Sequence, residues 1–283
     1  MGKIHRALIQ QKRRSQQPET GRREADARKD TDDTSRLRAL SDPLVVGDAR
    51  TIGVDRDVQH DNKILAQNGA VRHAAEGAYR MLRTRVMRSM RSNDWKVLGV
   101  SSGSQNEGKT YTAINLAISI AAEVDQEVVL IDLDLRRPTV YRCLGVDPED
   151  VTDLKDYFDD DDRDLQELFV CPEIERLACI LSTDPLDRPS DVLAAAAGRT
   201  LFDELRERLG PDVVVIVDLP PLLAADDALA VAPMLDAFLL VVAEGQAERQ
   251  DLEEVRMLLS EFNHIGTVLN KSIEKDSRRA NYY

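Results

Sequence analysis

From about residue 62 onward, hydrophobic and polar positions alternate between two periodicities. Short continuous apolar runs rich in Val and Ile predict strands buried on both faces. Between them, apolar residues that recur every three to four positions predict helices that cover a sheet. This alternation predicts an α/β fold with a parallel sheet and helices on both faces. The predicted strands are 96–100, 127–132, 177–181, 212–218, 237–243 and 266–270, and the predicted helices are 74–90, 111–122, 189–209 and 249–262.

The first 61 residues follow a different pattern. Residues 1–14 carry five Lys and Arg and no acid, with Ile4 and Leu8 one helical turn apart. This segment is either a solvated basic arm or a short amphipathic helix that docks on lipid or a partner. Residues 15–61 are polar with sparse aliphatics, which predicts a disordered linker. The predicted organisation is therefore an arm and linker over 1–61, one domain over 62–270 and a flexible polar tail over 271–283.

The distribution of charge along the chain limits the classes of binding partner. The 283 residues have a net charge of −13, but residues 1–93 hold 20 Lys and Arg against 12 acids, which leaves 18 against 39 for residues 94–283. An acidic body repels nucleic acid, so we expect no nucleic-acid partner. The three cysteines form no C-x-x-C pair, which favours core thiols in a reducing compartment. No apolar run reaches the ~18 residues of a membrane span, so we expect a cytoplasmic protein.

The segment 103–110 matches the phosphate-binding loop pattern G-x-x-x-x-G-K-[ST], with a predicted strand before it and a predicted helix after it. Such a loop turns successive N–H groups toward phosphate oxygens, while Lys109 bridges the outer phosphates and the Thr110 hydroxyl ligates Mg²⁺. A glycine turn that binds nothing is the alternative. The predicted nucleotide-binding residues are Gly103, Ser104, Gln105, Asn106, Glu107, Gly108, Lys109, Thr110 and Tyr111.

Carboxylates end two of the predicted strands. Asp132 and Asp134 close strand 127–132, and strand periodicity places both on one side, which suits two carboxylates acting on one Mg²⁺-bound phosphate. A capped turn with surface ion pairs is the alternative. Asp218 ends strand 212–218 where a Walker B carboxylate would orient Mg²⁺ through water. Pro220 and Pro221 then turn the chain away from the sheet.

The phosphate loop, Ile-Asp-Leu-Asp-Leu-Arg-Arg-Pro at 131–138, Val-Asp-Leu-Pro-Pro at 217–221 and the terminal Tyr282 and Tyr283 together resemble the bacterial P-loop tyrosine autokinases of capsule and exopolysaccharide synthesis. The resemblance spans about 74–283 and implies a P-loop NTPase fold of the Min/Par type. It also implies ATP and Mg²⁺ as cofactors and the terminal tyrosines as phosphate acceptors, mainly between chains. A tail end that is merely solvated is the alternative for these tyrosines.

The resemblance further implies roles for individual residues. Lys109 and the loop amides would hold the β- and γ-phosphates, and Thr110, Asp134 and Asp218 would position Mg²⁺. Asp132 would accept or orient the tyrosine proton, although the roles of Asp132 and Asp134 are interchangeable at this stage. Asn270 is similar to the family's adenine-edge contact, with a strand-ending turn residue as the alternative.

Assembly and partners also follow from the resemblance. Arg80 and Arg83 on helix 74–90 are similar to the family's Arg-rich helix, through which subunits assemble into a ring. Other implied partners are a membrane chain-length co-polymerase, which would activate the kinase and hold it at the inner membrane, and a protein-tyrosine phosphatase.

Two other protein classes compete with this reading. Min- and Par-type positioning ATPases share the sheet, but their loops carry a signature lysine where this chain has Ser104. A non-catalytic nucleotide-binding adaptor would be expected to have lost at least one of the loop and strand-end residues that are all present here.

Overall fold

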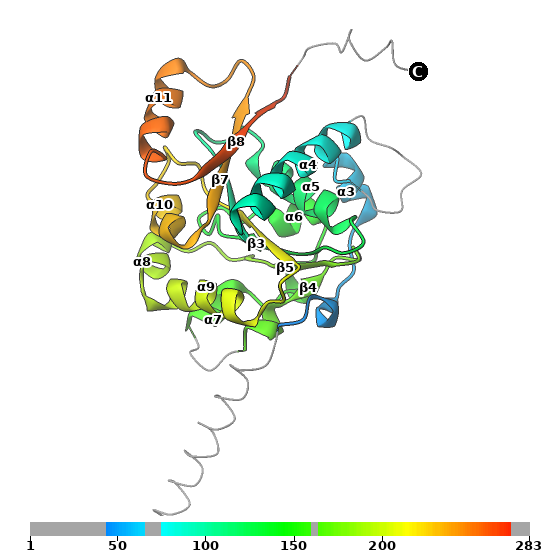
Figure 1. Cartoon of the computed structure of the whole chain (residues 1–283). Coiled ribbons are helices and arrows are strands. Elements are labelled where there is room, and N and C mark those ends of the chain that lie inside the picture. Colours follow the sequence, from blue (N-terminus) through cyan, green and yellow to red (C-terminus); the bar gives the residue numbers. More distant parts are fainter. Residues whose placement is uncertain (1–43, 66–74, 160–163, 273–283) are drawn as a thin grey trace, which may run out of the picture. The chain divides into compact units, whose positions relative to one another are not determined.

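Eight strands form one mostly parallel sheet in the computed structural model, which describes residues 44–65, 75–159 and 164–272 (Figure 1). The strand order is β1-β4-β5-β3-β6-β2-β7-β8, and every neighbouring pair is parallel except β4 and β5. The strands are β1 (Arg50–Thr51), β2 (Val97–Ser102), β3 (Glu127–Asp132), β4 (Val170–Cys171), β5 (Leu177–Ile180), β6 (Val213–Asp218), β7 (Ala237–Ala243) and β8 (His264–Asn270).

Helices cover both faces of this sheet (Figure 1). On one face lie α3 (Arg56–Asp61), α4 (Glu76–Asn93), α5 (Lys109–Ala121) and α6 (Val140–Leu144). On the other lie α7 (Leu154–Asp159), α8 (Pro189–Ala194), α9 (Ala196–Arg208), α10 (Asp227–Val231) and α11 (Arg249–Leu258). The short 3₁₀ turns are η1 (Val46–Asp48), η2 (Pro148–Asp150), η3 (Leu165–Leu168) and η4 (Ala232–Met234).

Strand β3 shows why the apolar runs are continuous. Val128 and Leu130 pack in the core beneath α5, whereas Val129 and Ile131 pack in the core on the opposite face. Successive side chains of a strand point to opposite faces, so a strand between two cores needs apolar residues at every position. Each fully buried aliphatic side chain of this kind contributes about 1.5–3 kcal/mol relative to exposure.

Helix α5 holds the site against the sheet. It packs on β2, β3 and α4, and nearly all of its residues are buried, including Ala113, Ala117 and Ala121. Small side chains let a helix approach its neighbours closely. Tyr111 is the one residue of α5 that is exposed. The first turn of the helix is thereby fixed relative to the carboxyl ends of the central strands.

The predicted linker is shorter than expected at its C-terminal end. Residues 44–61 contain η1, β1 and α3, and Leu44, Val46 and Ile52 are each only 3% exposed. Leu44 and Val46 lie in one core and Ile52 lies in the other, and β1 pairs with β4. The predicted arm over 1–14, the linker residues 15–43 and the tail residues 273–283, with Tyr282 and Tyr283, lie outside the described residues.

Two other details differ from the predicted elements. The helix predicted over 189–209 is interrupted at Ala195, whose extended backbone separates α8 from α9. At Gly198 a Cβ would stand 2.1 Å from the Leu193 carbonyl oxygen, so the two helices meet too closely for a side chain there. Strand β4 was not predicted, and its antiparallel pairing with β5 departs from the expected all-parallel sheet.

Candidate active site

The phosphate loop joins β2 to α5 at the carboxyl edge of the sheet. Gly108 has φ +95°, and a Cβ on it would lie 2.1 Å from Asn270 Nδ2, so glycine is required for both conformation and space. The side chain of Glu107 is only 2% exposed, and its carboxylate accepts hydrogen bonds from the N–H groups of Ser104 (2.7 Å) and Ala243 (3.2 Å). The predicted site residue Glu107 thus supports the loop from behind with its side chain.

The end of β8 is fastened to the same loop. Asn270 Nδ2 donates to the Glu107 carbonyl oxygen (2.9 Å), and Lys271 Nζ donates to the Asn106 carbonyl oxygen (2.5 Å). Asn270 is not among the residues that line the adjoining cavity. Its contact with adenine stays a prediction, whereas its contact with the loop backbone is present in the structure.

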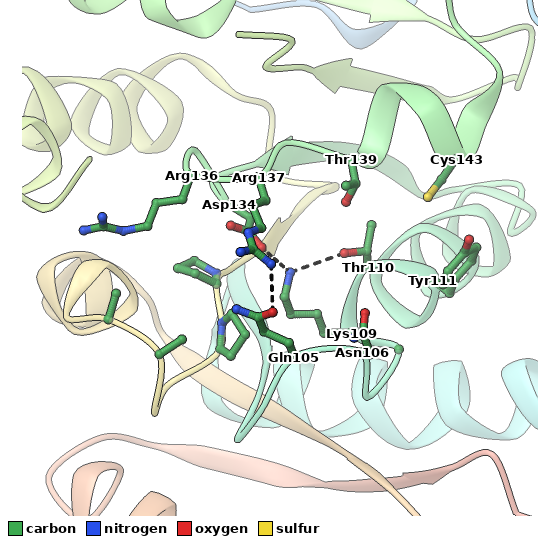
Figure 2. Close-up of a pocket in the computed structure, with 15 residues that line it drawn as sticks. Gln105, Asn106, Lys109, Thr110, Tyr111, Asp134, Arg136, Arg137, Thr139 and Cys143 are labelled. Atoms are coloured by element: carbon green, nitrogen blue, oxygen red, sulfur yellow. Dashed lines mark hydrogen bonds and ion pairs between the residues drawn. The ribbon is translucent and has the colours of Figure 1, made fainter. Parts of the chain in front are cut away.

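A cavity of about 410 Å³ opens above the loop (Figure 2). Its lining comes from the loop and the start of α5, from the segment 134–143 after β3, and from the segment 220–225 after β6. Of the predicted loop residues, Gln105, Asn106 and Gly108 to Tyr111 reach this lining. The carboxyl ends of the strands in an open α/β sheet are where such folds bind ligands.

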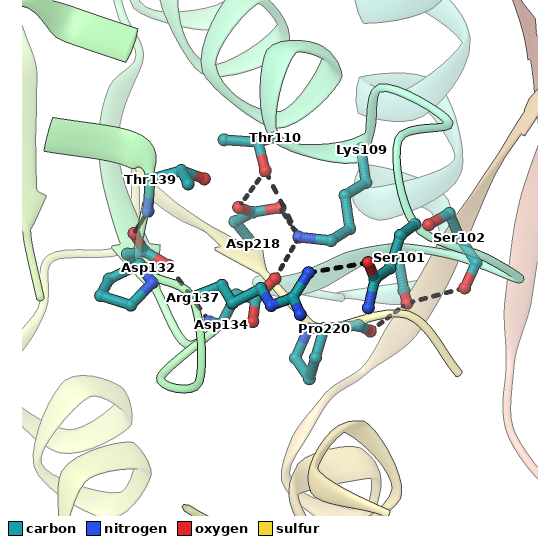
Figure 3. Close-up of polar contacts among 12 residues, drawn as sticks. Ser101, Ser102, Lys109, Thr110, Asp132, Asp134, Arg137, Thr139, Asp218 and Pro220 are labelled. Carbon is teal, nitrogen blue, oxygen red and sulfur yellow. Dashed lines mark hydrogen bonds and ion pairs between the residues drawn. The ribbon is translucent and has the colours of Figure 1, made fainter. Parts of the chain in front are cut away.

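Lys109 and two carboxylates, those of Asp134 and Asp218, meet beside the cavity (Figure 3). Lys109 Nζ lies 2.7 Å from Asp134 Oδ2 and 3.6 Å from Asp218 Oδ1. The Thr110 hydroxyl donates to Asp218 Oδ2 at 2.7 Å. The structure thus brings together four of the predicted site residues.

The electrostatics of this cluster follow from its burial. Burial lowers the pKa of Lys109, but the charges of Asp218 and Asp134 outweigh it, and the net pKa is raised. Burial raises the pKa of Asp218 to about 6, although Lys109 and the Thr110 hydrogen bond act in the opposite direction. Lys109 therefore stays an ammonium in the site.

Asp132 is oriented differently from its expected partner. Its carboxylate accepts from the N–H groups of Asp134 (3.1 Å), Thr139 (3.0 Å) and Val140 (3.0 Å). The predicted same-side pair is thus not formed, because β3 ends at Asp132 and strand periodicity no longer applies at Asp134. Burial, followed by the charge of Asp218, raises the pKa of Asp132 well above its usual range.

Comparisons with known proteins place this site in a family. No family model matches the chain. The chain is 30% identical over 201 residues to the tyrosine-protein kinase CpsD of Streptococcus pneumoniae, covering 70% of this chain and 84% of that protein. It belongs to the bacterial tyrosine kinases. The tyrosine-protein kinase YwqD of Bacillus subtilis is 27% identical over 208 residues, which cover 72% of this chain and 84% of YwqD.

Solved structures agree on the fold of the kinase. The kinase domain of the Escherichia coli tyrosine kinase ETK superposes with a TM-score of 0.63 at 24% identity, covering 81% of this chain and 92% of that one. MinD of Pyrococcus horikoshii, solved with Mg-ADP, gives a TM-score of 0.51 at 20% identity over 64% of the kinase and 72% of MinD. The protein is thus a protein-tyrosine kinase with the P-loop nucleotide-binding fold that it shares with MinD.

The oxygen atoms of the kinase's site suit Mg²⁺. Asp218 Oδ1 is buried and has no hydrogen-bond partner among the described residues, and Thr110 and Asp134 present further oxygens to the cavity. Mg²⁺ prefers oxygen ligands and typically binds through one or two carboxylates, waters and substrate phosphates. In the described part of the chain no group of three or more His, Cys, Asp and Glu could hold a metal by itself, which is compatible with that mode.

Sequence reasoning missed two arginines of the kinase's site. Arg136 pairs with buried Asp227 (Nη2 to Oδ1, 3.0 Å), and Asp227 also accepts from the Ser190 N–H (3.0 Å). Arg137 also lines the cavity, and its Nη1 donates to Gln105 Oε1 at 2.8 Å. Their position directly after the two aspartates was the available signal, but only the structure separates their directions.

The two arginines predicted for assembly differ in their surroundings. The Arg83 side chain is 19% exposed, with Nε 3.0 Å from Glu123 Oε1 and Nη1 donating to the Ser119 carbonyl oxygen at 2.8 Å. It therefore ties α4 to α5 within one chain. Arg80 has a side chain 58% exposed, with a 3.8 Å contact to Glu76.

No helix in the described residues is both long and apolar enough to span a membrane.

Proposed function

We propose that this kinase transfers the γ-phosphoryl group of ATP to Tyr282 and Tyr283, mainly between chains. The observation that carries the proposal is the cluster of Lys109, Asp134 and Asp218 beside a phosphate loop in a relative of tyrosine kinases. Phosphoryl transfer needs positioning and stabilisation of charge more than covalent chemistry, and these residues offer both.

Individual roles follow from the contacts. Lys109 exchanges its ion pair with Asp134 for the outer phosphates, and the loop N–H groups hold the same oxygens. Thr110 and Asp218 would hold Mg²⁺, which would neutralise phosphate charge. Asn270 keeps the loop in shape, and we retain adenine as its expected ligand.

The geometry favours Asp134 over Asp132 as the residue that accepts or orients the tyrosine proton. The Asp132 carboxylate already accepts three backbone hydrogen bonds, and the side chain is fully buried. Asp132 then acts as a positioning residue that fixes the turn carrying Asp134. Asp134 reaches the cavity and can orient or accept the proton of the tyrosine hydroxyl.

Transfer between chains rests on assembly. Helix α4 has a surface hollow of about 440 Å³ lined by residues that include Gly77, Arg80 and Met81, and Met81 is 49% exposed. We propose that this face contacts a second copy in a ring-like oligomer, with Arg83 as an internal support. A tail that leaves one subunit near a neighbour's site meets it at high effective concentration.

The names of the relatives bear on the biological setting. Relatives of the kinase are named CpsD and CapB, and one similar solved structure is that of the chimerical protein CapA2B2. We propose that the kinase regulates export or polymerisation of a capsular polysaccharide or exopolysaccharide. Its partners would be a membrane chain-length co-polymerase that holds it at the inner membrane and a protein-tyrosine phosphatase that reverses the modification.

The decisive experiment mixes two variants of the full chain with Mg·ATP. Lys109→Met keeps the tyrosines but loses the phosphate-binding cation, and Tyr282→Phe with Tyr283→Phe keeps the site but loses the acceptors. Mass spectrometry should find phosphotyrosine on the Lys109→Met chain only when the two are mixed. Wild type alone is the positive control.

Other outcomes are equally informative. Labelling of wild type without labelling of the Lys109→Met chain in the mixture would refute transfer between chains. Phosphate release by wild type with no phosphotyrosine at all would refute the terminal acceptors and favour a MinD-like switch.

The assembly proposal has a matched pair of variants. Arg80→Ala should lower the oligomer mass in light scattering with little change in melting temperature. Arg83→Ala should lower the melting temperature because it leaves Glu123 without this partner. Equal oligomer masses for Arg80→Ala and wild type, where wild type is oligomeric, would remove this part of α4 from the interface.

A further inference from the structure

The turn after β3 carries two neighbouring arginines in opposite directions (Figure 2). Both side chains line the cavity, and they differ in their partners. Arg136 binds Asp227, a carboxylate only 1% exposed. Arg137 lies over the phosphate loop and hydrogen-bonds the neutral Gln105 side chain at 2.8 Å.

The turn that holds Arg137 is rigidly supported. The Arg137 N–H donates to the Asp134 carbonyl oxygen (2.9 Å), and Pro138 follows with its φ fixed by its ring. The three hydrogen bonds to the Asp132 carboxylate tie together both ends of the same turn. A side chain on such a support can be placed accurately, as a site for phosphoryl transfer requires.

Charge distinguishes Arg137 from the other cations of the site. Lys109 faces Asp134 and Asp218, and Arg136 faces Asp227. Among the described residues Arg137 has no carboxylate partner, and its side chain bonds only to the neutral amide of Gln105. A guanidinium held by a neutral acceptor can exchange it for a phosphate at small cost, and its planar fork suits two phosphate oxygens.

We propose that Arg137 is a further catalytic residue, which leaves Gln105 to bind the γ-phosphate of ATP and stabilises the charge that develops during transfer. This inference rests on the proposed function. In the step, the bond from the γ-phosphorus to the β–γ bridging oxygen breaks, and the tyrosine oxygen bonds to that phosphorus. The tyrosine proton passes to Asp134, and ADP leaves with the bridging oxygen.

The test compares nucleotides that differ in the γ-phosphate. Calorimetry with Mg²⁺ gives the affinities of the full-length protein for ADP and for AMP-PNP, a non-hydrolysable ATP analogue. Arg137→Gln should lower the preference for AMP-PNP over ADP by about tenfold or more, because a charged hydrogen bond to the γ-phosphate is lost. Arg137→Lys should give a smaller loss, because lysine keeps the charge without the fork.

The matched control is Arg256→Gln. Arg256 is exposed, lies on α11 and does not line the cavity, so its replacement should leave the preference unchanged. In turnover, Arg137→Gln should lower kcat by on the order of 10²-fold or more, with a smaller change in the KM of the acceptor tyrosine.

The outcomes separate this inference from the function on which it rests. An AMP-PNP preference in Arg137→Gln within twofold of wild type would overturn the role of Arg137, whatever the kinase activity. Absence of phosphotyrosine on wild type would instead overturn the proposed acceptors, while the binding comparison would still decide the contact. If Arg137→Gln did not fold, the same comparison with Arg137→Lys would decide it.

Discussion

The buried carboxylate of Asp218 gives a prediction with a defined sign and size. Burial raises its pKa to about 6 against a usual value of 3.8, so the folded protein binds a proton more tightly than the unfolded chain. The stability that this proton confers is fully present below the unfolded pKa and is lost as the pH rises through about 6. Ionised Asp218 thus destabilises the fold at neutral pH.

The size follows from the shift. About two pKa units at ~1.36 kcal/mol each give a cost of about 3 kcal/mol above pH 6. Asp218→Asn keeps the shape and a carbonyl oxygen that can accept from Thr110, but it carries no charge. The variant should therefore match wild type near pH 4 and exceed its free energy of unfolding by up to about 3 kcal/mol at pH 8.

Urea unfolding of the nucleotide-free protein in EDTA would measure this difference, with the fluorescence of the single tryptophan, Trp95, as the signal. Asp125→Asn is the matched control for the change of residue type, because Asp125 is exposed and lies outside the site. Kinase activity of Asp218→Asn should be lost, since the variant lacks a predicted Mg²⁺ ligand. A stability difference that stayed constant from pH 4 to pH 8 would refute the reasoning.

Three further changes test the supports of the site. Gly108→Ala should weaken nucleotide binding and lower the melting temperature, and adding Asn270→Ala should recover part of the loss by removing the 2.1 Å clash; no recovery would mean that the backbone strain dominates. Arg136→Gln should cost about 3 kcal/mol in urea unfolding because it leaves buried Asp227 without its cation, and adding Asp227→Asn should restore much of it. Glu107→Gln replaces an acceptor with a donor behind the loop and should lower ADP affinity by about tenfold in calorimetry, whereas unchanged affinity would show that the loop holds its shape without this carboxylate.

The central strands could be predicted because burial on both faces leaves a strong pattern. The strands 127–132 and 237–243 have the predicted bounds, and both lie inside the sheet. The edge strand β8 begins at His264, two residues before the predicted start. An edge strand is only half covered, so its polar residues do not mark its beginning.

Elements held by a few contacts could not be predicted. Strands β1 and β4 have two residues each, which is too short to show a periodicity, and β1 consists of exposed Arg50 and Thr51. The segment around α3 has the same property, because Gln59 is buried by bonding to the Leu144 carbonyl oxygen (2.9 Å) and not by being apolar. Such hydrogen bonds join residues far apart in the chain, which leaves no local signal.

In the site, too, the sequence does not predict the directions of single side chains. The loop lysine and the strand-end aspartates follow from the motif, but the motif does not say where each side chain points after the strand ends. Asp132 turns toward backbone N–H groups and Asp134 toward Lys109, and Arg136 and Arg137 diverge in the same way. These directions depend on Asp227 and Gln105, which come from other parts of the chain.

The directions of these aspartate and arginine side chains can be understood from the balance of charge in the site. The three carboxylates of Asp132, Asp134 and Asp218 lie around one buried ammonium, and ATP would add further negative charge to the same cavity. Two like charges 4 Å apart repel by about 4 kcal/mol at an effective dielectric constant of 20, so a triphosphate needs additional cations there. Arg136 cannot serve, since its charge is matched by Asp227. Mg²⁺ and the guanidinium of Arg137 can supply that positive charge. A carboxylate near Arg137 would cancel the charge that the phosphate requires.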